Sequence, residues 1–125
     1  ELAHVGLSEE EAAKRYGGRI SILRWPYAEN DRAQAERKTQ GLIKLVVDRK
    51  ARILGVSIAG AGAAEMINMG ARAVTNTMTL KDVRGYVPPY PTMTEIGKRA
   101  AVSYYTPMTR KPYVRWIVRF LRRFG

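Results

Sequence analysis

The chain has 125 residues, 46% of them hydrophobic, and a formal net charge of +11 at pH 7. These values fit one globular domain with its own core, and no apolar run approaches the roughly 18 residues that span a membrane. Cysteine is absent and His4 is the only histidine, which excludes disulfides, thiol chemistry and a histidine-based metal cluster within this segment, and favours a reducing, cytoplasmic location.

The first predicted element is a short helix. Ser8 and Glu11 form a capping box, in which each side chain bonds the backbone N–H of the other residue. A helix is therefore expected from Glu9 to Tyr16. The pair Gly17-Gly18 should end it, because glycine readily adopts the conformation that closes a helix.

A strand and a capped stretch follow. The residues from Arg19 to Trp25 alternate between two faces, as in a half-buried strand, and Pro26 ends it. Asn30 or Asp31 then offers a cap for a short polar stretch, helical or irregular, that runs through Lys38.

Two further strands predict a hairpin at the centre of a sheet. Gly41 to Asp48 and Arg52 to Ala59 are rich in β-branched residues and are separated only by a short turn. The first of them is apolar on both faces, which indicates that both faces are covered. We therefore expect an antiparallel hairpin in the middle of the sheet and not at its edge.

The segment after the hairpin predicts a tight turn and a helix. Gly60-Ala61-Gly62 has the setting of a dinucleotide-binding loop, but Glu65 occupies the third glycine position and no βαβ unit frames it. A helix is expected from Ala63 to about Met78. One stripe of it should be buried, formed by Ala64, Ile67, Ala71, Val74 and Met78. Thr79 and Asp82 cap another helix, which Pro88 must end.

The stretch from Pro88 to Glu95 is the most distinctive of the chain. Its three prolines hold the backbone in an extended, non-helical form. Thr92 and Glu95 then form a capping box for a helix that begins near Met93. The hydroxyl of Tyr90 is therefore expected on a rigid corner, with a carboxylate one helical turn beyond it.

Tyr90 and Glu95 each have a structural interpretation beside a functional one. A tyrosine hydroxyl is neutral at pH 7 and can donate a hydrogen bond or relay a proton at a redox centre. Tyr90 also reads as an interface aromatic with a wet hydroxyl, and Glu95 is already explained by its place in the capping box. One aromatic and one carboxylate do not by themselves make a catalytic site, so their spacing alone favours the structural interpretation.

The end of the chain predicts a separate basic helix. Pro107 and Pro112 bracket a linker, so we divide the chain into a domain of residues 1–109 and a tail of residues 110–125. On a helix, one face of this tail is apolar and the opposite face is basic; the faces are Tyr113, Trp116, Ile117, Phe120, Leu121 and Phe124 against Arg115, Arg119, Arg122 and Arg123. This pattern is typical of a helix on an anionic membrane surface. The alternative is docking of the apolar face on the domain or its dimer mate.

Six blocks in order resemble the C-terminal domain of the pyridine nucleotide-disulfide oxidoreductases, the family of dihydrolipoamide dehydrogenase, glutathione reductase and mercuric reductase. The blocks fall within residues 1–101 and are Val5-Gly6-Leu7-Ser8-Glu9, Asp31-Arg32-Ala33, Gly41-Leu42-Ile43-Lys44-Leu45, Ile53-Leu54-Gly55-Val56, Ala63-Ala64-Glu65-Met66-Ile67 and Pro91-Thr92-Met93-Thr94-Glu95. Any one block is weak, but six in family order are specific.

The resemblance implies an α+β fold, an antiparallel sheet with helices packed around it, that serves as the homodimerisation domain of an oxidoreductase dependent on FAD and NAD(P). It places the FAD and NAD(P) domains and the redox cysteine pair upstream of Glu1, so this segment alone is expected to bind neither cofactor and to be inactive. Tyr90 and Glu95 become candidate catalytic residues. Pro89, Tyr90 and Pro91 become candidate contacts to the partner subunit's flavin.

The sequence departs from the family at Tyr90. The family usually has histidine at this position, paired with the glutamate as an acid–base for thiol exchange, and tyrosine is not a base near neutral pH. Mercuric reductases are similar in carrying tyrosine here, but they rely on a C-terminal cysteine pair, whereas this chain ends Arg122-Arg123-Phe124-Gly125. The electron acceptor and the choice of NAD or NADP are left open.

Two alternatives from other classes rest on the positive charge. One is a small basic nucleic-acid-binding module with tryptophans and tyrosines as stacking groups. The cations gather in the tail and no nucleic-acid-binding signature appears, so nucleic acid is the less favoured partner. The other is a membrane-tethering domain in which the enzyme-like part is only a scaffold.

Overall fold

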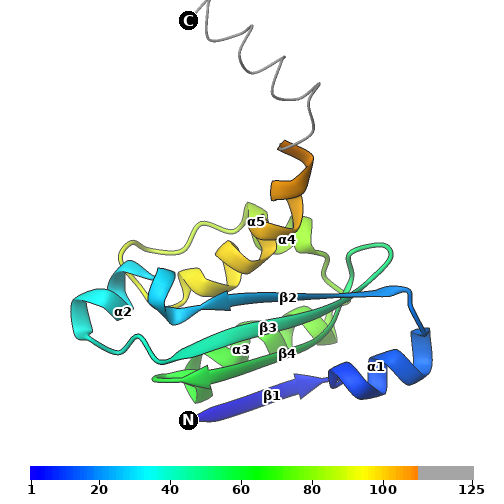
Figure 1. Ribbon diagram of the computed structural model, residues 1–125, viewed down its shortest axis with the longest axis horizontal. Helices are drawn as coiled ribbons and strands as arrows, with labels where there is room; N and C mark the ends of the chain where they lie inside the picture. Colours follow the sequence, from blue (N-terminus) through cyan, green and yellow to red (C-terminus); the bar gives the residue numbers. More distant parts are fainter. Residues whose placement is uncertain (110–125) are drawn as a thin grey trace, which may run out of the picture.

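The computed structural model describes residues 1–109 (Figure 1). In that range helices flank a four-stranded antiparallel sheet, which confirms the predicted α+β class. The strands are β1 (Leu2–Gly6), β2 (Ile20–Pro26), β3 (Gly41–Asp48) and β4 (Ile53–Gly60). The helices are α1 (Glu9–Tyr16), the short 3-10 helix η1 (Tyr27–Glu29), α2 (Asp31–Glu36), α3 (Ala63–Thr75), α4 (Leu80–Gly85) and α5 (Glu95–Thr109).

The hairpin of β3 and β4 lies at the centre of the sheet, whose strand order is β1-β4-β3-β2. Its apolar residues have neighbours on both sides, since Leu45 pairs with Leu23 of β2 and with Val56 of β4. The prediction of a central hairpin is therefore confirmed.

The edge strand β1 was not anticipated from the sequence. Only Ala3 and Val5 of this short strand pack against the core. The alternation of apolar and polar residues is therefore too short to distinguish a strand from an irregular segment before α1. The strand forms because β4 offers a free edge, along which Val5 pairs with Val56 and Leu2 pairs with Ala59.

The two faces of the sheet are covered unequally. On one face α3 lies against β1 and β4, and α5 lies against β2 and β3 (Figure 1). The core between them is built from alternate residues of the central strands and from small residues of the helices; it includes Ile43, Leu45, Val47, Val56, Ile58, Ala63, Ala73, Ile96 and Ala100. The opposite face is covered only in part, by α1, whose Ala12 is fully buried.

Helix α3 ends earlier than predicted, at Thr75 and not at Met78. Thr77 adopts a left-handed conformation with φ of 52°, which ends the helical path. The carbonyl of Met78 then accepts the N–H of Ile53 at 3.0 Å, so this part of the chain has returned to the sheet.

The buried side of α3 also differs from the predicted stripe. Its fully buried residues are Ala63, Gly70 and Ala73, whereas Ala64 is exposed. The reason is a close approach at Gly70, where an added Cβ would lie 2.9 Å from the Cβ of Val56. The absence of a side chain decides which side of the helix meets the sheet.

Helix α5 begins at Glu95, two residues after the predicted start, and continues through Pro107 to Thr109 where the sequence predicted a linker. A proline within a helix removes one backbone hydrogen bond without ending the helix in every case. The tail of residues 110–125, with its predicted amphipathic helix, lies outside the described residues. Within the described range no helix is long and apolar enough to cross a membrane.

Candidate functional site

The loop between α4 and α5 carries Tyr90 and runs over the amino-terminal end of α2 (Figure 1). Three successive residues of the chain, Asn30, Asp31 and Arg32, each bond a different part of this loop. The peptide bond between Tyr90 and Pro91 is cis. The loop is therefore fixed to a neighbouring helix and does not rest on its prolines alone.

Asn30 performs two tasks with one side chain. Its Oδ1 accepts the N–H of Ala33 at 2.9 Å, which caps α2, and its Nδ2 donates to the carbonyl of Thr92 at 3.0 Å. Asn30 is only 3% exposed, and a buried amide of this kind needs such partners. Capping of α2 and placement of the loop are therefore coupled through Asn30.

Tyr90 is largely exposed, at 70%, yet its hydroxyl has a defined partner. It donates to Oδ2 of Asp31 at 2.7 Å. This hydrogen bond, the negative charge of Asp31, slight burial and the charge of Glu95 together raise the pKa of Tyr90 above 10.0. The hydroxyl is therefore neutral at pH 7, with its proton directed toward Asp31 and its oxygen free to accept a further hydrogen bond.

Glu95 lies at the first turn of α5 and is partly buried. Its Oε2 accepts the N–H of Thr92 at 3.3 Å, which is half of the predicted capping box. The hydroxyl of Thr92 instead donates to the carbonyl of Pro89 at 2.7 Å. Glu95 thus stabilises both the helix start and the loop, and it also lines a small cavity of about 290 Å³ with Val87, Pro88, Lys98, Arg99 and Val102.

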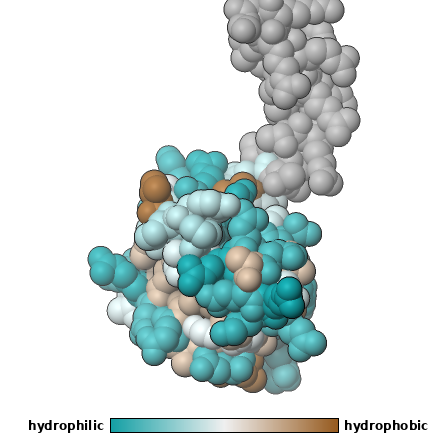
Figure 2. Space-filling view, turned by 90° about the vertical axis from the view of Figure 1, so that its left-hand side faces the viewer, coloured by the Kyte–Doolittle hydropathy of each residue, from teal (hydrophilic) through white to brown (hydrophobic). Residues whose placement is uncertain are grey.

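The loop also presents apolar surface. Val87 is 81% exposed, and Tyr86 beside it is exposed as well. The end of the molecule that bears α2 is otherwise mostly hydrophilic, with hydrophobic residues at separate points (Figure 2). An exposed aromatic and aliphatic corner held by polar bonds is suited to contact with a flat apolar group or with another subunit.

The structure places the two predicted residues, Tyr90 and Glu95, on the same loop and helix start. No local pattern indicated that Asp31 would accept the hydrogen bond of the Tyr90 hydroxyl, because these residues are 59 positions apart. Among residues 1–109, no three His, Asp, Glu or Cys side chains group closely enough to hold a metal ion.

Comparison with known proteins gives one family. The family described as "Pyridine nucleotide-disulphide oxidoreductase, dimerisation domain" matches residues 1–101. The chain is 35% identical to mitochondrial dihydrolipoyl dehydrogenase of Rattus norvegicus over 86% of its length, and 36% identical to dihydrolipoyl dehydrogenase of Bacillus subtilis over 81%. In both cases it spans 22% of the length of the relative.

Solved structures share the fold. The HOCl-induced flavoprotein disulfide reductase RclA from Escherichia coli superposes with a TM-score of 0.74 at 28% identity, covering 81% of this chain and 23% of that protein. LpdA from Mycobacterium tuberculosis superposes with a TM-score of 0.75 at 22% identity, covering 82% of this chain and 22% of that one.

Proposed function

Because the chain belongs to the pyridine nucleotide-disulphide oxidoreductase family as its dimerisation domain, we propose that it is the homodimerisation domain of an oxidoreductase dependent on FAD and NAD(P). The observation that carries this proposal is the family match over residues 1–101. The flavoprotein and dehydrogenase relatives, of which the chain spans about a fifth, support it. The cofactor domains and the redox cysteine pair belong to the rest of the complete protein.

Within that enzyme, the Tyr90 loop contacts the partner subunit's flavin site. Two observations support this proposal: the side chains of Tyr90 and Val87 are exposed, and hydrogen bonds to the start of α2 hold the loop in place. The carbonyls of Pro89 and Pro91 are already engaged by Thr92 and Arg32, so these prolines offer ring surface and not polar contacts. Such a surface fits the face or edge of a flavin, but it is too small to hold the cofactor alone, and the isolated domain is expected to bind neither FAD nor NAD(P).

The bound flavin would supply the electron transfer between NAD(P)H and the cysteine pair. The residues of this chain have a smaller task. Tyr90 keeps its own proton, which it donates in a hydrogen bond to Asp31, and offers its oxygen to a donor that approaches from the exposed side. Glu95 holds the backbone of Thr92 and so keeps the loop in place. Tyr90 therefore accepts a hydrogen bond from a donor group of the substrate and positions that group, and it does not act as a base near neutral pH.

Replacing Tyr90 by Phe in the complete enzyme tests this role. If the hydroxyl oxygen accepts a hydrogen bond from a group whose positive charge develops in the transition state, turnover of a small disulfide with NAD(P)H should fall about 10² to 10³-fold, while flavin content and the dimer stay intact. A loss below about threefold would leave Tyr90 as a packing residue, since the ring survives the change. Tyr90→His is the complementary variant: it restores the usual family histidine beside Glu95 and should raise disulfide reduction.

The contact of residues 110–125 with an anionic membrane surface stays a prediction that rests on the sequence pattern alone. Deleting this tail from the complete protein should abolish salt-sensitive binding to anionic liposomes, to which each arginine contributes about 1 kcal/mol. Unchanged liposome binding would favour the other interpretation of the tail.

A further inference from the structure

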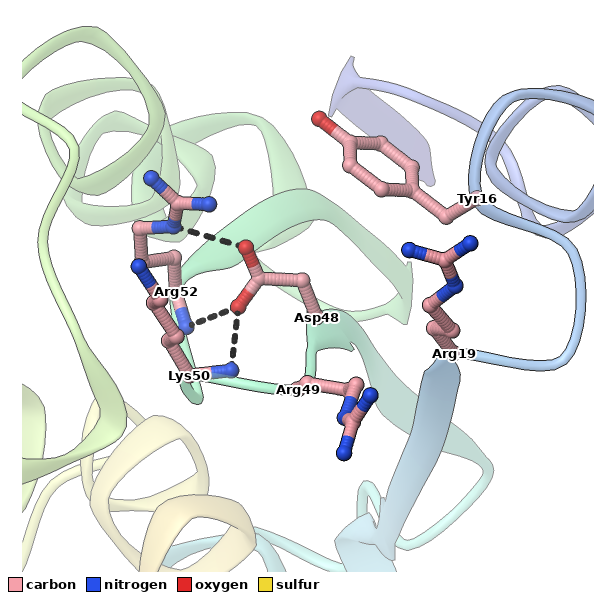
Figure 3. A pocket seen from close by; sticks show the side chains of 6 residues that line it. All are labelled: Tyr16, Arg19, Asp48, Arg49, Lys50 and Arg52. Carbon is pink, nitrogen blue, oxygen red and sulfur yellow. Dashed lines mark hydrogen bonds and ion pairs between the residues drawn. The ribbon is translucent and has the colours of Figure 1, made fainter.

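A basic cavity of about 500 Å³ lies at the end of the sheet opposite the Tyr90 loop, where the β3–β4 turn faces the turn after α1. Its six lining residues include four cations and one carboxylate; they are Tyr16, Arg19, Asp48, Arg49, Lys50 and Arg52. Figure 3 shows Tyr16 and Arg19 on one side, facing Asp48 and Arg52 on the other. The cavity is thus formed by two turns that are distant in the sequence.

The one carboxylate of the cavity is used within its own turn. Asp48 accepts the backbone N–H groups of Lys50 and Arg52 at 2.9 Å each, and the Nε of Arg52 at 2.7 Å (Figure 3). It is 5% exposed. Burial alone would raise the pKa of Asp48, but these three hydrogen bonds outweigh it and hold the pKa below its ordinary value of 3.8. Asp48 is therefore ionised at neutral pH and neutralises Arg52.

The other three cations have no such partner. Within the part of the chain that the structure describes, no carboxylate forms an ion pair with Arg19, Arg49 or Lys50. Helix α1 ends on the cavity wall at Tyr16, and a helix carboxyl end carries only about half a negative charge. The cavity therefore holds an excess of more than two positive charges.

We propose that this cavity binds a small phosphate-bearing anion of the polyphosphate class. Arginine donors in a fixed fork match phosphate oxygens, and several clustered cations attract a multivalent anion more strongly than a monovalent one. The volume lies within the range of about 300 to 1,000 Å³ of small-molecule sites. Two short turns bound the cavity, and it has one aromatic residue, so it suits a compact ligand better than an extended nucleic-acid strand with its stacked bases.

The test is a calorimetric titration of the complete protein with inorganic tripolyphosphate at fixed ionic strength. The double variant Arg19→Gln/Arg49→Gln should bind at least about tenfold more weakly, because it removes two charged hydrogen-bond donors. Both residues are exposed, so the thermal unfolding curve should be unchanged. The matched control is Arg72→Gln/Lys81→Gln, which also removes two charges, from exposed sites on α3 and α4, and should leave the affinity as it was.

Three outcomes overturn the proposal. Equal affinity in parent and double variant places the ligand elsewhere, for example at a nucleotide site of the upstream domains. An equal loss in the control Arg72→Gln/Lys81→Gln indicates attraction by net charge without a site. Tighter binding of a single-stranded oligonucleotide than of tripolyphosphate, lost in the double variant, assigns the cavity to nucleic acid.

Discussion

At the scale of single residues, the placement of the Tyr90 loop depends on the first residues of α2. Asn30 is extended, with φ of −105° and ψ of 125°, and the helix begins at the next residue. The change of direction spreads the side chains of Asn30, Asp31 and Arg32 so that each reaches a different residue of the loop. The conformation of a corner built from prolines is thereby selected by polar groups 59 to 62 positions earlier in the chain.

The first prediction concerns Asp31→Asn. Removing the carboxylate should lower the pKa of Tyr90 toward its ordinary value of 10.0, because the Asp31 hydrogen bond and charge are the main causes of its elevation. The raised pKa stabilises the protonated form, so this contribution is present below pH 10 and is lost as the pH rises through the folded-state value. Phenolate absorbance against pH measures it, with Tyr90→Phe identifying the contribution of Tyr90 among seven tyrosines.

The control for that titration is Glu29→Gln, a nearby exposed carboxylate that should leave the Tyr90 titration unchanged. If Asp31→Asn also leaves it unchanged, the hydroxyl is not bonded to Asp31 in solution, and the role proposed for Tyr90 loses its geometric basis.

The second prediction concerns Asp48→Ala in the β3–β4 turn. The change leaves two backbone N–H groups and a guanidinium without their acceptor, so we expect a loss of about 1.5 to 3 kcal/mol in the free energy of unfolding at pH 7. Since the pKa of Asp48 is lowered in the folded state, its stabilisation is complete above about pH 4 and declines as the pH falls through the folded-state value. Urea unfolding at pH 7 and pH 3 should show a smaller difference at pH 3. A difference that is equal at both values contradicts the ionised, hydrogen-bonded state of Asp48.

At the scale of the elements, local sequence signals predicted the starts of helices better than the edge strand β1 or the end of helix α3. The capping boxes Ser8–Glu11 and Thr79–Asp82 both form, and they begin α1 and α4 where expected. These boxes use neighbouring residues only, so the sequence contains all that they need. The strand β1 forms by pairing with β4, and the segment after α3 is drawn to the sheet by the hydrogen bond between Ile53 and Met78. No local pattern in the sequence shows either contact.

The candidate site was predictable to the same degree. The prolines around Tyr90 and the spacing of Thr92 and Glu95 are local, and they indicated a stiff corner before a helix. The partner of each polar group was not local: the Thr92 hydroxyl bonds Pro89 and not the helix start, and the Tyr90 hydroxyl bonds Asp31. Only half of the Thr92–Glu95 box forms, because the N–H of Glu95 donates to the backbone carbonyl of Thr92 at 3.5 Å and not to its hydroxyl.

The third prediction concerns the contact of α3 with the sheet. Gly70→Ala would place a methyl group within 2.9 to 3.1 Å of three side-chain atoms of Val56. Overpacking of this kind costs about 1 to 3 kcal/mol, while alanine gains about 1 kcal/mol over glycine in a helix. We expect net destabilisation of up to about 2 kcal/mol, measured by urea unfolding. Gly85→Ala in α4, where nothing lies within 4 Å, should be neutral or stabilising, and equal effects at both glycines would contradict the close approach.

At the scale of the whole molecule, part of the sheet has no cover within the described chain. Leu2, Ala59, Leu42 and Pro26 lie opposite one another across all four strands and so share one face. Leu2 is 78% exposed and Leu42 38%. We expect this apolar row and the exposed Val87 to meet other parts of the proposed enzyme, either its cofactor domains or its second subunit.

The last prediction concerns the proposed dimer and the side on which Tyr90 acts. A twofold dimer of the complete protein should bury on the order of 2,000 Å² or more, and sedimentation at micromolar concentration should show no monomer.

Tyr90→Phe subunits are then mixed with subunits that lack the upstream redox cysteines. If Tyr90 serves the partner's site, each mixed dimer has one intact site, since the unmutated cysteines of one subunit meet the unmutated Tyr90 of the other. An equal mixture that exchanges subunits freely should recover about a quarter of the parent activity, because half of the dimers are mixed and each has one of two sites intact. If Tyr90 served its own subunit, both sites of a mixed dimer would be defective and mixing would restore nothing. Absence of recovery despite proven subunit exchange would therefore reject the crossed arrangement while leaving the dimer itself in place.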